Sequence, residues 1–120
     1  MRGESYLTRN VQFQLVYKKG STWAGREIVL KALPNELEIT RYGFAVGKRI
    51  GKAVVRNKVK RRLREILRQV PLQKGWDIVI IARMPAARMD YQSLEKCVGK
   101  LLDRAGIFTG EYEGVSPGVN

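Results

Sequence analysis

Five polar residues within one short segment have the side-chain types and the spacing needed to bind phosphate groups. They are Arg56, Asn57, Lys60, Arg61 and Arg64. Residues three and four apart lie on one side of an α-helix, so a helix brings these side chains together. Arginine donates paired hydrogen bonds from a planar group, lysine supplies a mobile point charge, and asparagine both donates and accepts. The pattern therefore predicts a surface that binds a polyanion.

The same segment carries the apolar period of an α-helix. At 100° per residue, its apolar side chains fall within an arc of about 120°. They are Val55, Val59, Leu63, Ile66, Leu67 and Val70. An adjoining arc of about 100° contains no acidic residue and holds Asn57, Lys60, Arg61, Arg64 and Arg68. Like charges spaced i,i+4 destabilise an isolated helix by a few tenths of a kcal/mol per pair, so an anionic partner explains this face better than folding does.

The positive charge of the chain is concentrated around this helix. The formal net charge is +12, and residues 41–68 contain eleven Lys or Arg against one acid, Glu65. The other residues contain twelve Lys or Arg and ten Asp or Glu. Solubility is served by scattered charge, whereas a phosphate backbone rewards charge gathered on one face. Nucleic acid is therefore the expected partner, ahead of a membrane surface.

The residues available for catalysis by the protein itself are few. The chain has no histidine, which excludes His-based triads, His metal sites and histidine proton shuttles. Cys97 falls on a predicted helix, where a buried structural thiol is expected rather than a nucleophile. The carboxylates show no metal-ligand spacing, and Gly43, Gly47 and Gly51 lack the Gly-Lys-Ser/Thr of a phosphate loop. We expect no catalytic and no metal-binding residue.

The pattern of apolar residues and of turn residues predicts seven elements. They are helices at residues 8–19, about 55–70 and 90–104, and strands at residues 27–33, 36–40, 42–46 and 77–82. Thr8 or Asn10 is expected to cap the first helix and Gly20 to end it, while Pro71 ends the second. The apolar strand 77–82 is expected in the middle of the sheet.

This order, α-β-β-β-α-β-α, predicts a single-domain α+β fold in which helices pack on a central sheet. We expect the domain to span residues 1–109 and residues 110–120 to form a flexible C-terminal tail. Residues 1–10 lack the apolar stretch of a secretory signal, and no stretch approaches the ~18 apolar residues of a membrane span. With a single cysteine, which fits a reducing compartment, the expectation is a soluble cytoplasmic protein with no membrane partner.

Phe13 and Tyr17 lie one turn apart on the first predicted helix and allow two interpretations. Packed inward, they are ordinary core residues. Exposed beside a basic sheet, they form a platform on which unpaired bases stack. The residues alone leave both open.

The basic segment also resembles a known family. Residues 43–64, GFAVGKRIGKAVVRNKVKRRLR, resemble the bacterial ribonuclease P protein subunit. That family has the pattern Arg-Asn-x-x-Lys-Arg-x-x-Arg, which is matched here by Arg56, Asn57, Lys60, Arg61 and Arg64. Residues 13–20, FQLVYKKG, resemble the first helix of that family, and residues 77–83, DIVIIAR, resemble its last strand. The resemblance covers about residues 7–107. It implies a ribosomal protein S5 domain 2-like fold with a left-handed β-α-β crossover, where the general handedness rule predicts a right-handed one.

In this family an RNA subunit holds the catalytic Mg²⁺ and removes the 5′ leader of precursor tRNA, and the protein helps the RNA bind substrate and metal. The resemblance implies contact with the RNA subunit by Lys48, Arg49, Lys52, Arg56, Asn57, Lys60, Arg61 and Arg64. It implies contact with the precursor tRNA leader by Arg9, Phe13, Tyr17, Val29 and Lys31. It implies no metal bound tightly by the protein and no obligate protein partner.

Two departures from the family and two other functions bear on this interpretation. Lys31 stands where some members carry an aromatic residue and favours a leader phosphate over base stacking; Tyr17 stands where phenylalanine is frequent. A structural RNA-binding module, such as a ribosomal protein, would explain the charge but not the Phe13 and Tyr17 pair. A protein nuclease would need a carboxylate cluster, which the sequence does not show.

Overall fold

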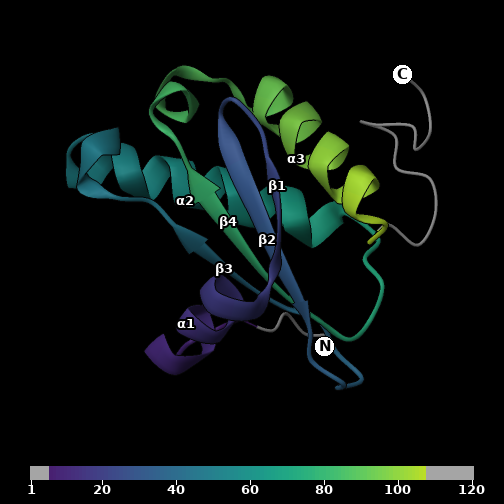
Figure 1. The fold of residues 1–120 in the computed structure, drawn as a ribbon. Helices are drawn as coiled ribbons and strands as arrows, with labels where there is room; N and C mark the ends of the chain where they lie inside the picture. Colours follow the sequence, from purple (N-terminus) through teal and green to yellow (C-terminus); the bar gives the residue numbers. More distant parts are fainter. Residues whose placement is uncertain (1–5, 108–120) are drawn as a thin grey trace.

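The computed structural model describes residues 6–107, which form a mixed α+β domain (Figure 1). The elements are α1 (Asn10–Lys19), β1 (Ser21–Ala24), β2 (Ile28–Pro34), β3 (Arg41–Ala45), the 3-10 helix η1 (Lys48–Ile50), α2 (Ala53–Gln69), β4 (Trp76–Ala82), the 3-10 helix η2 (Met84–Arg88) and α3 (Tyr91–Ala105). The predicted fold class and the order α-β-β-β-α-β-α are confirmed. The predicted C-terminal tail lies outside the described residues.

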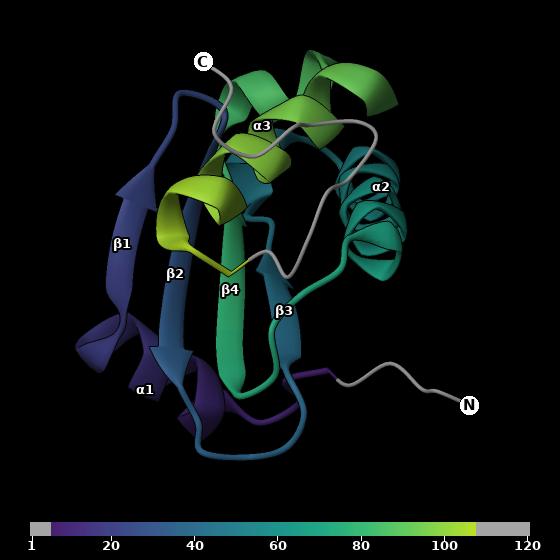
Figure 2. The ribbon, with the colours of Figure 1, turned by 90° about the vertical axis from the view of Figure 1, so that its right-hand side faces the viewer.

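The sheet places β4 in its interior, as its continuous apolar run predicts. The strand order is β1-β2-β4-β3, and Figure 2 shows the four strands side by side. β4 pairs antiparallel with β2 and parallel with β3. Ile78, Val79 and Ile80 of β4 are completely buried, because both faces of the strand are covered. The chain passes from β3 through α2 to β4, which makes the predicted β-α-β crossover; its left-handed sense stays a prediction from the resemblance.

One predicted strand is wrong. Residues 36–40 form a loop, in which Leu37 and Ile39 are exposed although they alternate with polar residues as in a strand. Asn35 starts this loop: its Oδ1 accepts a hydrogen bond from the N–H of Leu37 at 2.7 Å, and Glu36 has a φ of 61°. Such an Asx turn takes the backbone out of the extended conformation. The strand that the sequence did not predict is β1. It is a short, mostly exposed edge strand without an apolar alternation.

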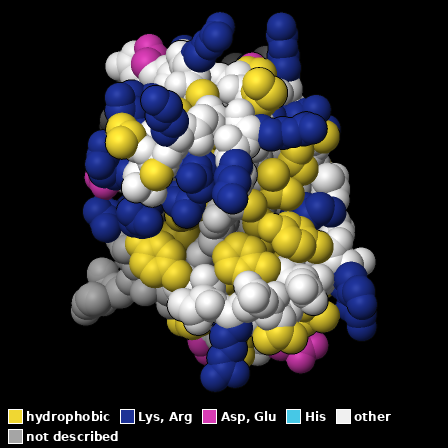
Figure 3. All heavy atoms as spheres, turned by 90° about the vertical axis from the view of Figure 1, so that its left-hand side faces the viewer, with side chains coloured by type: hydrophobic (Ala, Val, Ile, Leu, Met, Phe, Trp, Pro, Cys, Tyr) yellow, Lys and Arg dark blue, Asp and Glu magenta, His cyan; other side chains and the backbone are white. Residues whose placement is uncertain are grey.

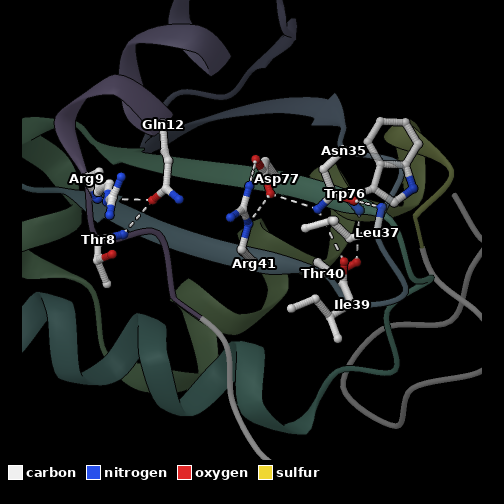
Figure 4. Close-up of polar contacts among 10 residues, drawn as sticks. All are labelled: Thr8, Arg9, Gln12, Asn35, Leu37, Ile39, Thr40, Arg41, Trp76 and Asp77. Atoms are coloured by element: carbon white, nitrogen blue, oxygen red, sulfur yellow. Dashed lines mark hydrogen bonds and ion pairs between the residues drawn. The ribbon is translucent and has the colours of Figure 1, made fainter.

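The ends of α1 also differ from the prediction. Neither Thr8 nor Asn10 caps the helix: Arg9 is the N-cap residue, and the side-chain oxygen of Gln12 accepts from the N–H groups of Thr8 and Arg9 at 2.9 and 3.0 Å (Figure 4). Gly20 does end the helix, but with a φ of −76° rather than a left-handed one. Glycine is needed there because a Cβ would lie 2.5 Å from the carbonyl oxygen of Val16.

Apolar side chains form two clusters, one on each face of the sheet. The larger cluster joins one sheet face to α2 and α3 and includes Leu30, Leu63, Ile66, Ile80, Leu94 and Leu102. The smaller one, on the face that carries α1, consists of Leu7, Val16 and Val79, with Phe13, Leu33, Ala45 and Ile81 packed against it. Because Ala45 and Ile81 stay partly exposed, α1 leaves part of this second face open. That open part is where a ligand can reach the sheet.

A buried carboxylate joins the start of β3 to β4 and to the loop after β2. Among residues 6–107, Asp77 is the one charged residue that is buried. Its two oxygens accept from Arg41 Nε at 2.9 Å and Nη2 at 2.7 Å, and from Asn35 Nδ2 at 2.8 Å (Figure 4). The same Asn35 amide donates to the carbonyl oxygen of Ile39. Hydrogen bonding to Asp77 raises the pKa of Arg41. The loop that replaces the predicted strand is thereby held to the sheet.

We expect Asp77→Ala to lower the free energy of unfolding by about 2–4 kcal/mol, because the donors of Arg41 and Asn35 lose their acceptor. Urea unfolding at pH 7 measures this change. The matched control is Glu65→Ala, which breaks an exposed ion pair with Arg68 and should cost less than about 1 kcal/mol. Equal losses in the two variants would contradict a structural role for the buried carboxylate.

Candidate nucleic-acid interface

The helix α2 buries its apolar stripe and turns its basic residues outward. Val59, Leu63, Ile66 and Leu67 are buried, and Val70 is buried directly after the helix, as predicted. We call Arg56, Asn57, Lys60, Arg61 and Arg64 the basic face of α2. Within this set Asn57 and Arg61 are exposed, and the other three are half-buried. The first turn of the helix contains no acidic residue. The predicted apolar stripe is therefore buried except at Val55, which is half-buried at the start of the helix.

The cations of α2 differ in how the protein holds them. Arg56 Nε donates to the carbonyl oxygen of Gly51 at 3.1 Å, and Arg62 Nη1 donates to that of Met89 at 2.6 Å. The guanidinium of Arg64 lies over the ring of Tyr6, 5.9 Å from its centroid. Lys60 and Arg61 make no hydrogen bond or ion pair with another side chain of the described part of the chain. Their charges are therefore available to an external phosphate.

A basic pocket lies where β3 and β4 end. It is a hollow of about 620 Å³ whose lining includes four cations, Arg26, Lys48, Arg49 and Arg83. Ala45 and Ile81, from the open part of the sheet, also line it, so the pocket continues that surface. Met84, which is 62% exposed, stands at the same site. Lys48 and Arg49 thus lie at the sheet end rather than on α2, and Lys52 lies at the helix start as its N-cap.

Sequence reasoning missed Arg26 and Arg83. They come just before β2 and just after β4, two ends that the antiparallel pairing brings together. The N–H of Arg83 donates to the carbonyl oxygen of Glu27, and its Nη1 donates to that of Gly25 at 3.1 Å. No local pattern marks these two arginines, because their neighbourhood exists only after β2 and β4 have paired in register.

The aromatic platform consists of Phe13 and Tyr17 of α1 together with Val29 and Lys31 of β2. The rings of Phe13 and Tyr17 have centroids 6.5 Å apart. Phe13 is half-buried against the sheet, since a Cβ on Gly43 would lie 2.4 Å from its Cζ. Tyr17 is 39% exposed, and the part that is buried raises the pKa of its hydroxyl. Each of the two interpretations therefore holds for one residue of the pair. Phe13 packs against the sheet, and Tyr17 presents its ring to solvent.

The two strand residues of the platform point to the face that α1 partly covers. Val29 pairs with Ile81 across the β2–β4 register, and Lys31 pairs with Val79. Lys31 Nζ donates to Thr22 Oγ1 of the neighbouring strand at 2.7 Å, which holds the ammonium at the sheet surface. Arg9 is exposed at the start of α1, one turn before Phe13. The structure therefore gathers the residues expected to bind the leader around one helix and one sheet face.

Charge and apolar surface lie next to each other on one side of the molecule. Figure 3 shows this side, with Lys and Arg side chains gathered in its upper half and a band of apolar side chains directly below them. A cationic surface beside aromatic rings is typical of proteins that bind single-stranded nucleic acid, since the cations follow the backbone and the rings stack on bases. Among the described residues, no three His, Cys, Asp or Glu side chains gather as a metal site would require. In the same part of the chain, no helix is long and apolar enough to cross a membrane.

Comparison with known proteins identifies the family. A family model described as Ribonuclease P matches residues 1–106. The ribonuclease P protein component of Dehalococcoides mccartyi is 44% identical over 116 residues, 97% of each chain. The RNase P protein of Staphylococcus aureus superposes with a TM-score of 0.80 at 33% identity, covering 89% of this chain and 100% of its own. That of Thermotoga maritima superposes with a TM-score of 0.69 at 33% identity, covering 83% and 96%. This chain belongs to the ribonuclease P protein family.

Cys97, on α3, is held in an environment that suppresses thiol reactivity. Its Sγ donates to Glu27 Oε1 at 3.4 Å, which ties α3 to the segment before β2. Burial and the neighbouring carboxylate raise the pKa of this thiol to about 11. A thiol becomes a nucleophile only as the thiolate, so this raised pKa leaves little of the reactive form of Cys97 near neutral pH.

We expect alkylation of Cys97 by iodoacetamide to be slow at pH 7–9 and to accelerate toward pH 11, because the thiolate fraction grows only there. Mass spectrometry of the native protein across this pH range gives the rate. Glutathione and the urea-unfolded chain serve as controls and should show a midpoint near the ordinary value of about 8.5. The same midpoint in the native protein would contradict the assignment of a suppressed thiol.

Proposed function

We propose that this chain assists a ribonuclease P RNA subunit, which holds the catalytic Mg²⁺, in removing the 5′ leader of precursor tRNA. The observation that carries the proposal is the basic face of α2, which matches the family pattern and turns outward without any acidic residue. The proposal assigns no bond-breaking step to the protein. Its side chains supply charge, stacking surfaces and orientation, and Mg²⁺ in the RNA subunit supplies the cleavage chemistry.

The basic face of α2 is proposed to bind the RNA subunit. Lys60 and Arg61 have unengaged donors, and Arg56 and Arg64 are held by the protein in defined positions. Asn57 is exposed between them and can contact a ribose hydroxyl or a base edge. Four cations on one helix side span several phosphates, so binding must weaken steeply as salt rises. Lys52 extends the same surface at the start of the helix.

The aromatic platform and the basic pocket are proposed to bind the leader. Tyr17 presents a ring for an unpaired base, with Phe13 supporting it, and Lys31 and Arg9 supply charge for the leader backbone. The open sheet surface then continues through Ile81 into the basic pocket, whose four cations suit the next phosphates. Because Lys48 and Arg49 line that pocket, we propose that they contact the leader as well as the RNA subunit.

We propose that this arrangement lowers the Mg²⁺ concentration that the reaction requires. The leader and the RNA subunit are both polyanions and repel each other. Protein cations that contact both strands reduce this repulsion, as free Mg²⁺ does at higher concentration. The benefit of the protein must therefore be greatest where Mg²⁺ is scarce.

We expect the purified chain to stimulate leader cleavage by a transcribed ribonuclease P RNA at low Mg²⁺, and to have little effect at high Mg²⁺. Gel analysis of cleaved precursor tRNA measures the rate. Arg61→Ala should weaken binding of the RNA subunit about tenfold and reduce its salt dependence. Lys58→Ala, an exposed cation outside the basic face, is the control. Absence of stimulation, with ribosomal RNA bound in preference, would replace this function with that of a structural RNA-binding protein.

We expect Tyr17→Leu and Phe13→Ala to weaken binding of precursor tRNA about 5- to 100-fold, the effect of losing one stacked base. Mature tRNA, which lacks a leader, should bind unchanged. Leu15→Ala is the matched control, because Leu15 is exposed on nearly the opposite side of α1. Equal losses with and without a leader would remove the platform from the leader path.

A further inference from the structure

Arg64 is restrained in a way that leaves its hydrogen-bond donors unused. Its guanidinium carbon lies 5.9 Å from the centroid of the Tyr6 ring, within the range of about 6 Å for a cation–π contact. Arg56, by contrast, uses its Nε on the carbonyl oxygen of Gly51. No hydrogen bond or ion pair joins Arg64 to another described residue. A contact through the ring face restrains the planar group and consumes none of the five N–H donors that lie in its plane.

Tyr6 is itself fixed by the sheet. Its ring packs edge-to-face on Tyr42, with centroids 5.1 Å apart and an interplanar angle of 84°. The two residues form an isolated parallel bridge, and the N–H of Leu7 donates to the carbonyl oxygen of Tyr42 at 3.0 Å. Tyr42 is 5% exposed and lies in the larger core cluster. The ring beneath Arg64 therefore stands on the core rather than on a loose end of the chain.

We propose that Tyr6 is a positioning residue for Arg64. The ring holds the guanidinium on the basic face of α2 with its edge donors free for an RNA phosphate. A long arginine side chain loses much rotamer freedom when it binds, and a side chain that is already restrained loses less. This inference rests on the proposed binding of the RNA subunit by the basic face, and it adds a residue outside the helix and outside the family pattern.

The test measures binding of a transcribed Dehalococcoides mccartyi ribonuclease P RNA to the full chain and to variants of Tyr6. Tyr6→Leu keeps an apolar side chain on Tyr42 but removes the ring. It should weaken binding about two- to fivefold, the size of an exposed cation–π contact. Tyr6→Phe and Tyr6→Trp keep a ring face and should restore binding to at least half of the wild-type affinity. A purely structural role would not follow the presence of a ring in this way, provided that thermal unfolding shows all three variants folded.

A double-mutant cycle with Arg64→Ala ties the effect to its partner. In the Arg64→Ala chain, Tyr6→Leu should have no further effect, because the group that it positions is gone. An undiminished effect of Tyr6→Leu in that chain, or a Tyr6→Trp variant as weak as Tyr6→Leu, would overturn the proposal. Failure of the proposed function has a different signature: the wild-type chain itself would then show no preference for ribonuclease P RNA over ribosomal RNA.

Discussion

The structure depends on one helix that must bury apolar side chains on one side while it keeps like charges together on the other. Repulsion between neighbouring cations on α2 costs a few tenths of a kcal/mol per pair. Burial of Val59, Leu63, Ile66 and Leu67 contributes about 1.5–3 kcal/mol for each side chain, so the apolar stripe decides the balance. The helix is thus stable enough to present Lys60, Arg61 and Arg64, which form no ion pair with an acidic residue in the described part of the chain. The sheet and α3 supply the other apolar side chains of the core on which this helix packs.

The position of β4 in the sheet separates the two candidate binding surfaces of the domain. One face of β4 contributes Ile78 and Ile80 to the core beneath α2 and α3, and the other face contributes Val79 to the small cluster beneath α1. The basic face of α2 and the aromatic platform therefore belong to opposite layers of one domain. The basic pocket lies at one end of the sheet, where β3 leads into η1 and β4 into η2, and its lining includes Ala45 and Ile81 of the face that α1 partly covers. Residues 6 and 7 connect the layers as well: Tyr6 packs under Arg64, and Leu7 is buried in the small cluster.

Two groups that could be reactive, a thiol and a buried carboxylate, are each engaged by neighbouring residues in the structure. The thiol of Cys97 is kept protonated, and the buried carboxylate of Asp77 is fully engaged by Arg41 and Asn35. Cations, in contrast, remain available on α2 and around the pocket. Two residues at which this chain departs from the pattern of its family, Lys31 and Tyr17, both carry polar groups. Lys31 is held by Thr22 at the sheet surface as a charged group, and Tyr17 carries a hydroxyl on the ring that it presents to solvent.

The sequence by itself determined the elements whose pattern is strong and local. The 3.6-residue period of α2, the continuous apolar run of β4 and the glycine stop after α1 are properties of neighbouring residues, and they predicted the fold class, the element order and the basic face. Tertiary structure alone decided features that rest on distant pairs. β1 is too short and polar to recognise before it pairs with β2, and residues 36–40 alternate like a strand but are turned away by Asn35. Arg26 and Arg83 meet only through the β2–β4 register, and Tyr6 reaches Arg64 only through its contact with Tyr42. Local periodicity reports which face of an element is apolar, whereas the partner of that face depends on long-range packing that no short pattern encodes.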